Sequence, residues 1–89
     1  MRPSPEPEDR RALRDAKLTE LGRYAKELCP AGRVQMSTAQ YEDEDGHVDL
    51  YPPPTLSEDD EDRIELALAA RAGEIFDETG LFILCAVLG

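Results

Sequence analysis

The feature that most constrains the fold is the stretch LFILCAVL at residues 81–88, in which every residue is apolar. It is too short to cross a bilayer as a helix, which takes about 20 residues. Both of its alternating faces are apolar, a pattern typical of a strand buried on both sides of its sheet. We therefore predict a C-terminal strand.

A helix is predicted directly before this strand. Ser57 is a good N-cap, and Gly80 is a natural glycine at a helix C-terminus. Between them, four residues at helical spacing form an apolar stripe: Ile64, Leu68, Ala72 and Ile75. A strand, a long helix and a second strand imply a right-handed parallel crossover.

A first helix is predicted from Pro7 to Cys29, ended by Pro30 and Gly32. Residues 1–7 contain three prolines and are expected to form a loose leader. Residues 8–89 then form one compact domain. The apolar stripe of this helix consists of Leu18, Leu21, Tyr24, Ala25 and Leu28.

The segments Arg33–Tyr41 and His47–Tyr51 are predicted to form a hairpin. A three-residue loop, Glu44-Asp45-Gly46, pairs Gln40 with Leu50 and brings the apolar residues of both strands to one face. That loop places Gly46 where a left-handed residue is needed. The apolar residues concerned are Val34, Met36, Val48 and Leu50.

The predicted fold is therefore α+β: a small α-β-β-α-β two-layer domain with a three-stranded mixed sheet and two helices. If both helices cover one face, alternate residues of the last strand are exposed on the other, and a second copy or another protein is expected to cover them. The alternative is that the first helix lies on the opposite face. A flat face of Leu66, Ala70 and Gly73 on the second helix would let another helix approach closely, and it is expected to pack against the first helix rather than to form a dimer contact.

The net charge of −10 is unevenly distributed. Residues 1–33 hold eight basic and six acidic residues, and residues 34–89 hold two basic and fourteen acidic ones. This field disfavours nucleic acid and anionic membranes and favours a basic protein surface. Cys29 and Cys85 lack metal-type spacing and predict reduced, buried thiols. With no signal-peptide pattern at the start, a cytoplasmic protein is expected.

Acidic residues are concentrated in residues 41–62, which contain no basic residue. One group is expected at the hairpin tip, and another in the first turn of the second helix, where the helix dipole favours negative charge. If both lie on one side, they form a single negative field that attracts cationic partners. The predicted partner-binding residues are Glu42, Asp43, Glu44, Asp45, Asp49, Glu58, Asp59, Asp60, Glu61 and Asp62.

The same segment does not fit a calcium loop. With Gly46 at position 6 of an EF-hand loop, positions 1 and 12 fall on Tyr41 and Pro52, which are not carboxylates. His47 is interpreted as an exposed hairpin residue, and no nucleophile has a recognisable partner. No catalytic residue, metal site or cofactor is predicted.

The stretch GHVDL, followed by a helix and ETGLFIL, resembles the second half of minimal nucleotidyltransferases in element order over roughly residues 33–88. In that family two aspartates of an Asp-x-Asp strand bind metal ions. The resemblance implies a metal-binding Asp49, helped by Asp43 or Asp45. His47 replaces the first aspartate and Met36-Ser37 lacks the Gly-Ser element, so a catalytically inactive relative is implied.

The leading hypothesis is a small acidic interaction module, an adaptor or inhibitor without enzymatic activity, that docks by its negative surface onto a basic partner. One form of it is a nucleic-acid mimic occupying the groove of a nucleic-acid-binding protein. The alternatives are the nucleotidyltransferase-like subunit and a homodimer formed through the C-terminal strand, in which the acids serve solubility alone.

Overall fold

A computed structural model describes residues 7–38 and 45–88, with side chains from residue 11 onward. Two helices and three strands follow one another in the predicted α-β-β-α-β order. The elements are α1 (Pro7–Leu28), β1 (Arg33–Ser37), β2 (Gly46–Tyr51), α2 (Glu58–Thr79) and β3 (Ile83–Val87). The α+β prediction is confirmed.

The three strands form one mixed sheet in the order β1-β2-β3. β1 pairs antiparallel with β2, placing Val34 opposite Leu50 and Met36 opposite Val48. The predicted common apolar face is therefore confirmed. β3 pairs with β2 in parallel and lies at the edge of the sheet.

The predicted hairpin register is wrong. Leu50 lies opposite Val34 rather than Gln40, and Ser37 lies opposite His47, so the connection is longer than three residues. Gly46 belongs to β2, and Gly80 is the one described glycine with a positive φ. The shift from Gln40 to Val34 is an even number of residues, which preserves the faces. Residues 39–44 lie outside the described part of the chain.

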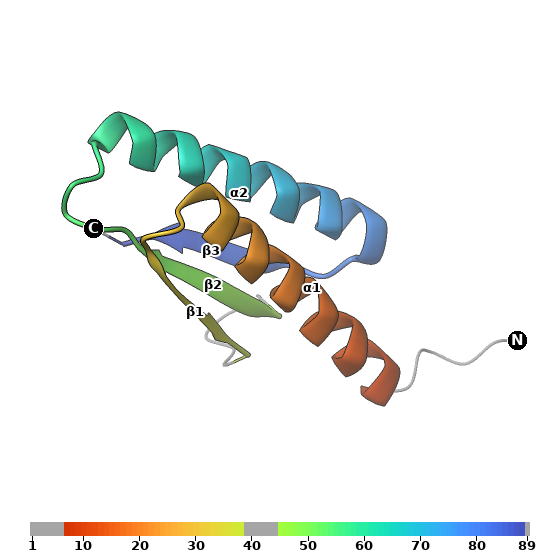
Figure 1. Cartoon of the computed structure of the whole chain (residues 1–89). Coiled ribbons are helices and arrows are strands. Elements are labelled where there is room, and N and C mark those ends of the chain that lie inside the picture. Colours follow the sequence, from red (N-terminus) through yellow and green to blue (C-terminus); the bar gives the residue numbers. More distant parts are fainter. Residues whose placement is uncertain (1–6, 39–44, 89) are drawn as a thin grey trace, which may run out of the picture.

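Both helices cover the same face of the sheet (Figure 1). One buried cluster joins Leu21 of α1, Leu50 of β2 and Leu68 of α2, none of which is exposed to solvent. Burial of a leucine stabilises a fold by about 1.5–3 kcal/mol. The alternative with α1 on the opposite face is therefore excluded, and the far face of the sheet has no covering helix among the described residues.

The ends of α2 are set by the predicted residues. The Ser57 hydroxyl accepts a hydrogen bond from the Asp60 backbone N–H at 3.1 Å. Gly80 adopts the left-handed conformation, with φ 77°, and its N–H donates to the Phe76 carbonyl at 2.8 Å. Neither described helix is long and apolar enough to cross a membrane.

Candidate interaction surface

Two of the acidic residues that were expected to form one surface, Asp45 and Glu58, lie at opposite ends of the described fold. Asp45 precedes β2 and exchanges hydrogen bonds with the backbone of Phe82, just beyond the C-terminal end of α2. Glu58 begins α2 at its other end, and a 22-residue helix is about 33 Å long. The expectation of a shared side is wrong for Asp45 and Glu58. Glu42, Asp43 and Glu44 lie outside the described residues.

Asp45 has a structural role in this arrangement. Its backbone N–H donates to the Phe82 carbonyl at 2.7 Å, and its carboxylate Oδ2 accepts from the Phe82 N–H at 2.8 Å. These two bonds fasten the segment entering β2 to the segment entering β3. These hydrogen bonds give the Asp45 side chain a structural role within the sheet.

The acidic residues at the start of α2 are explained in large part by the helix itself. Glu58, Asp59, Asp60 and Glu61 occupy its first turn, where negative charge interacts favourably with the helix dipole. Arg63 lies 3.4 Å from the Asp60 carboxylate, so this group is not free of basic side chains. Asp62 follows them and is exposed.

Asp49 and His47 lie on the sheet face that carries no helix. His47 Nε2 is 4.0 Å from Asp49 Oδ2, and both side chains are largely shielded. The described residues contain no group of three or more His, Cys, Asp or Glu side chains that could hold a metal ion. Of the residues that the nucleotidyltransferase resemblance implies, Asp45 uses its Oδ2 to accept a hydrogen bond from the Phe82 N–H.

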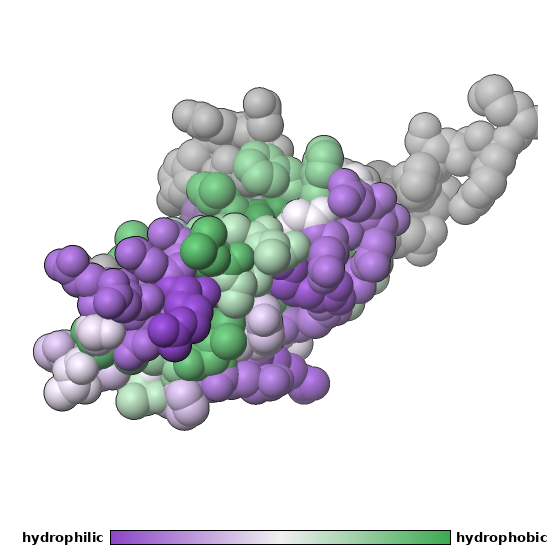
Figure 2. Space-filling model, turned by 90° about the horizontal axis from the view of Figure 1, so that it is seen from above, coloured by the Kyte–Doolittle hydropathy of each residue, from purple (hydrophilic) through white to green (hydrophobic). Residues whose placement is uncertain are grey.

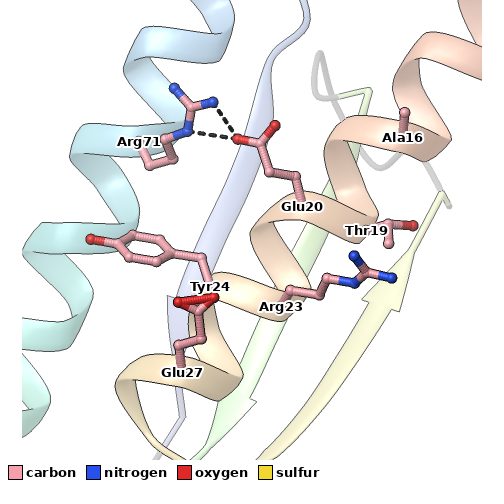
Figure 3. Close-up of a pocket in the computed structure, with 7 residues that line it drawn as sticks. All are labelled: Ala16, Thr19, Glu20, Arg23, Tyr24, Glu27 and Arg71. Atoms are coloured by element: carbon pink, nitrogen blue, oxygen red, sulfur yellow. Dashed lines mark hydrogen bonds and ion pairs between the residues drawn. The ribbon is translucent and has the colours of Figure 1, made fainter.

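A polar hollow of about 400 Å³ lies between the two helices. Figure 3 shows Arg71 reaching from α2 to Glu20 on α1, while Tyr24 points across toward α2. Arg71 Nε donates to Glu20 at 2.6 Å, and Lys17 donates to the other Glu20 oxygen at 3.3 Å. Two acidic and two basic side chains line this hollow, so we interpret it as part of the packing contact between α1 and α2.

Desolvation and ion pairing act in opposite directions on Glu20. Partial burial tends to raise its pKa, but hydrogen bonds from Arg71 and Lys17, with their positive charges, outweigh burial. The pKa of Glu20 is therefore held below its ordinary value. Its carboxylate remains charged and paired throughout the neutral range.

The predicted exposure of β3 is confirmed on the uncovered face. Leu84 and Leu88 share that face and are 47% and 42% exposed, while Phe82, 42% exposed, packs its ring edge-on against Phe76 of α2 with the ring centroids 6.4 Å apart. Ile83, by contrast, is buried under the helices. Monomeric proteins rarely leave large apolar patches exposed to solvent. This face is an apolar surface that the described part of the chain does not cover.

β3 also has an unpaired edge. The Leu88 N–H donates to Leu50 and the Phe82 N–H to Asp45, so both point toward β2. Successive peptide groups of a strand alternate in direction. The N–H and C=O groups of the odd-numbered residues Ile83, Cys85 and Val87 therefore point to the free edge. No described strand lies beyond it.

A groove of about 420 Å³ runs between this edge and α2, and we call it the β3–α2 groove. Every residue lining it is uncharged. The lining residues are Ala69, Ala72, Gly73 and Phe76 from α2, with Phe82, Ile83, Leu84 and Cys85 from the other wall. An apolar groove on a chain of net charge −10 suits an uncharged, apolar occupant.

The small-residue face of α2 is turned toward solvent, not toward α1. Leu66 is 71% exposed, Ala70 is exposed, and outside the local helix backbone no atom lies within 4 Å of the place where a Cβ on Gly73 would be. The predicted packing of this face against α1 is therefore wrong. Figure 2 shows hydrophobic residues gathered over the middle of the molecule, between two hydrophilic areas.

Both cysteines are free, and Cys85 lies in the groove. Burial, with a smaller contribution from the charge of Asp49, raises the pKa of the Cys85 thiol to about 11. Cys85 is therefore a protonated, weakly reactive side chain at neutral pH. It contributes to the groove as an apolar residue.

Sequence reasoning missed the β3–α2 groove because it treated the C-terminal strand and the small-residue face separately. The available signal was the spacing of Ala69, Gly73 and Phe76, which places them on one side of α2. Comparison with known proteins adds nothing: no family model, no curated protein and no solved structure matches this chain.

Proposed function

We propose that this protein is a non-catalytic interaction module that binds a partner chain by adding a strand to the free edge of β3. The observation that carries this proposal is the uncharged β3–α2 groove lying directly beside that edge. In strand addition the backbone supplies hydrogen bonds and the adjoining pockets supply specificity.

The two edges of the sheet differ in their chemistry. β1 carries Arg33 and Gln35, both exposed, and Arg33 stacks over the Tyr51 ring at 4.7 Å. β3 contains no charged residue and no proline. Natural sheets usually protect an edge with charges, prolines or a cover. An unprotected apolar edge therefore favours a binding role for β3 over β1.

The acidic residues take a secondary place in this proposal. Asp45 and the α2 start lie at opposite ends of the fold, which favours the apolar edge of β3 over acid-first docking or nucleic-acid mimicry as the binding surface. Glu58–Asp62 then serve solubility and the steering of a partner. The two free thiols support a reducing compartment such as the cytoplasm.

The proposal is tested with a charge placed in the groove. Gly73→Glu puts a carboxylate where there is open space, so the fold of one copy is undisturbed. Ala12→Glu, on the exposed side of α1, makes the same charge change elsewhere and is the matched control. Proteins retained from native lysate by the wild-type chain are compared with those retained by each variant, at low and high salt.

We expect retention by the wild type and by Ala12→Glu, persistence at high salt, and loss with Gly73→Glu. Retention that survives Gly73→Glu would contradict docking through the groove. Binding through the acidic residues would be favoured instead if retention is lost at high salt or when Glu58, Asp59 and Asp60 are neutralised.

A further inference from the structure

We propose that the occupant of the β3 edge is a second copy of this chain, which pairs antiparallel with β3 about a two-fold axis at Cys85. This inference rests on the proposed interaction role of the groove. It goes further by naming the partner and the register.

The register follows from the direction of the backbone groups. Ile83, Cys85 and Val87 point their N–H and C=O groups outward. In an antiparallel ladder, two outward-pointing residues placed opposite each other exchange both hydrogen bonds. Centring the axis on Cys85 sets Ile83 against the partner's Val87 and Cys85 against itself, so every outward group is used. Centring it on Leu84 or Ala86 leaves an outward-pointing residue at one end unpaired.

The side chains on the uncovered face complement one another in this register. Leu84 faces the partner's Ala86, a large residue beside a small one. Phe82 lies opposite the partner's Leu88, and both are about 42% exposed. The register therefore brings together side chains that a single copy leaves partly exposed.

The helices above the sheet limit how closely two copies can approach. Packed helices lie about 8–10 Å apart, whereas strands lie about 4.8 Å apart, so two helices overhang a three-stranded sheet. Pairing at β3 accordingly brings the two α2 helices together. Ala69 and Gly73 line the groove on that side, and the open space at Gly73 leaves room for a close approach.

Charge is compatible with a second copy at this surface. Each copy carries −10, but the residues lining the groove are uncharged, so the strand contact itself places no like charges opposite one another, and only the acidic residues elsewhere on the two α2 helices repel. A partner recognised by charge would instead require basic or acidic residues in the groove. The best match to an uncharged, apolar edge is the same edge.

The available area indicates a weak dimer. Phe76 and Phe82 are about half exposed, and an aromatic side chain buries about 150–250 Å², so the pair offers on the order of 200 Å² per copy. With Leu84 and Leu66 the total over both copies stays below the roughly 1,200 Å² of a standard interface. We therefore expect a weak association, with a dissociation constant in the micromolar range or above.

Sedimentation equilibrium from about 1 to 500 µM covers the micromolar range. For the wild type and Ala12→Glu we expect the mass to double across that range, and for Gly73→Glu we expect it to stay that of one copy. In parallel, amide exchange measured by NMR should slow at Ile83, Cys85 and Val87 at the concentrations at which the mass doubles. Exchange at Leu84 and Ala86, whose amides already face β2, should change little.

A wild-type chain that stays monomeric throughout would overturn the inference, as would doubling that is unaffected by Gly73→Glu or that leaves the three edge amides unprotected. A monomer whose lysate partners are still lost with Gly73→Glu would sink the dimer and leave the interaction role standing. A monomer whose partners ignore Gly73→Glu would sink both.

Discussion

Glu20 illustrates how one side chain links the two helices. It accepts hydrogen bonds from Arg71 of α2 and from Lys17 of its own helix, and its pKa is lowered as a result. The carboxylate is 36% exposed, so solvent screening limits the value of this contact.

Glu20→Gln should lower the free energy of unfolding at pH 7 by about 0.5 kcal/mol. Because the folded-state pKa of Glu20 is depressed, its contribution is present above the ordinary glutamate value of 4.5 and is lost as the pH falls below that value. Urea unfolding at pH 7 and near pH 3 measures this, and the difference between variant and wild type should close at the lower pH. Glu74→Gln, which removes the more exposed partner of Arg71, should have a smaller effect. An equal loss at both pH values would point to a packing effect instead.

At the scale of the element, α2 contains two glycines with opposite requirements. Gly80 ends the helix at φ 77°, where L side chains are strained, whereas Gly73 lies within the helix with open space around it. The same substitution at the two positions should therefore act with opposite signs.

Gly80→Ala should destabilise the fold by about 1 kcal/mol, and Gly73→Ala should stabilise it by about 0.5–1 kcal/mol through helix propensity. Chemical denaturation below about 1 µM, where one copy predominates, measures both. Destabilisation by Gly73→Ala would mean that the space beside α2 is filled already in the monomer.

Elements and their ends were predictable because they depend on local chemistry. Ser57 and Gly80 bound α2 where the sequence placed them, and the alternation in β1 and β2 gave the correct faces. The register was not predictable, because a hairpin shifted by an even number of residues buries the same side chains. The position of Asp45 depends on how the elements are arranged in space. Because α2 runs antiparallel to β2 and β3, the start of β2 and the start of α2 lie at opposite ends of the sheet.

At the scale of the whole molecule, charge and apolar surface act in opposite ways on association. Two copies of charge −10 repel one another, and salt shortens the range of that repulsion from about 10 Å at 0.1 M to about 3 Å at 1 M. Self-association through the uncharged groove should therefore strengthen by up to about tenfold, or 1.4 kcal/mol, between these salt concentrations. Docking of the acidic residues onto a basic surface should weaken. Sedimentation at both concentrations distinguishes them, and a dimer that dissociates in salt would contradict the apolar contact.

The difference between the two sheet edges sets a limit on growth. Pairing of β3 with its own copy uses up the apolar edge of each subunit and leaves β1, with its exposed Arg33 and Gln35, at both margins of the enlarged sheet. Such an assembly is self-limiting: it closes at two subunits instead of elongating into a fibre.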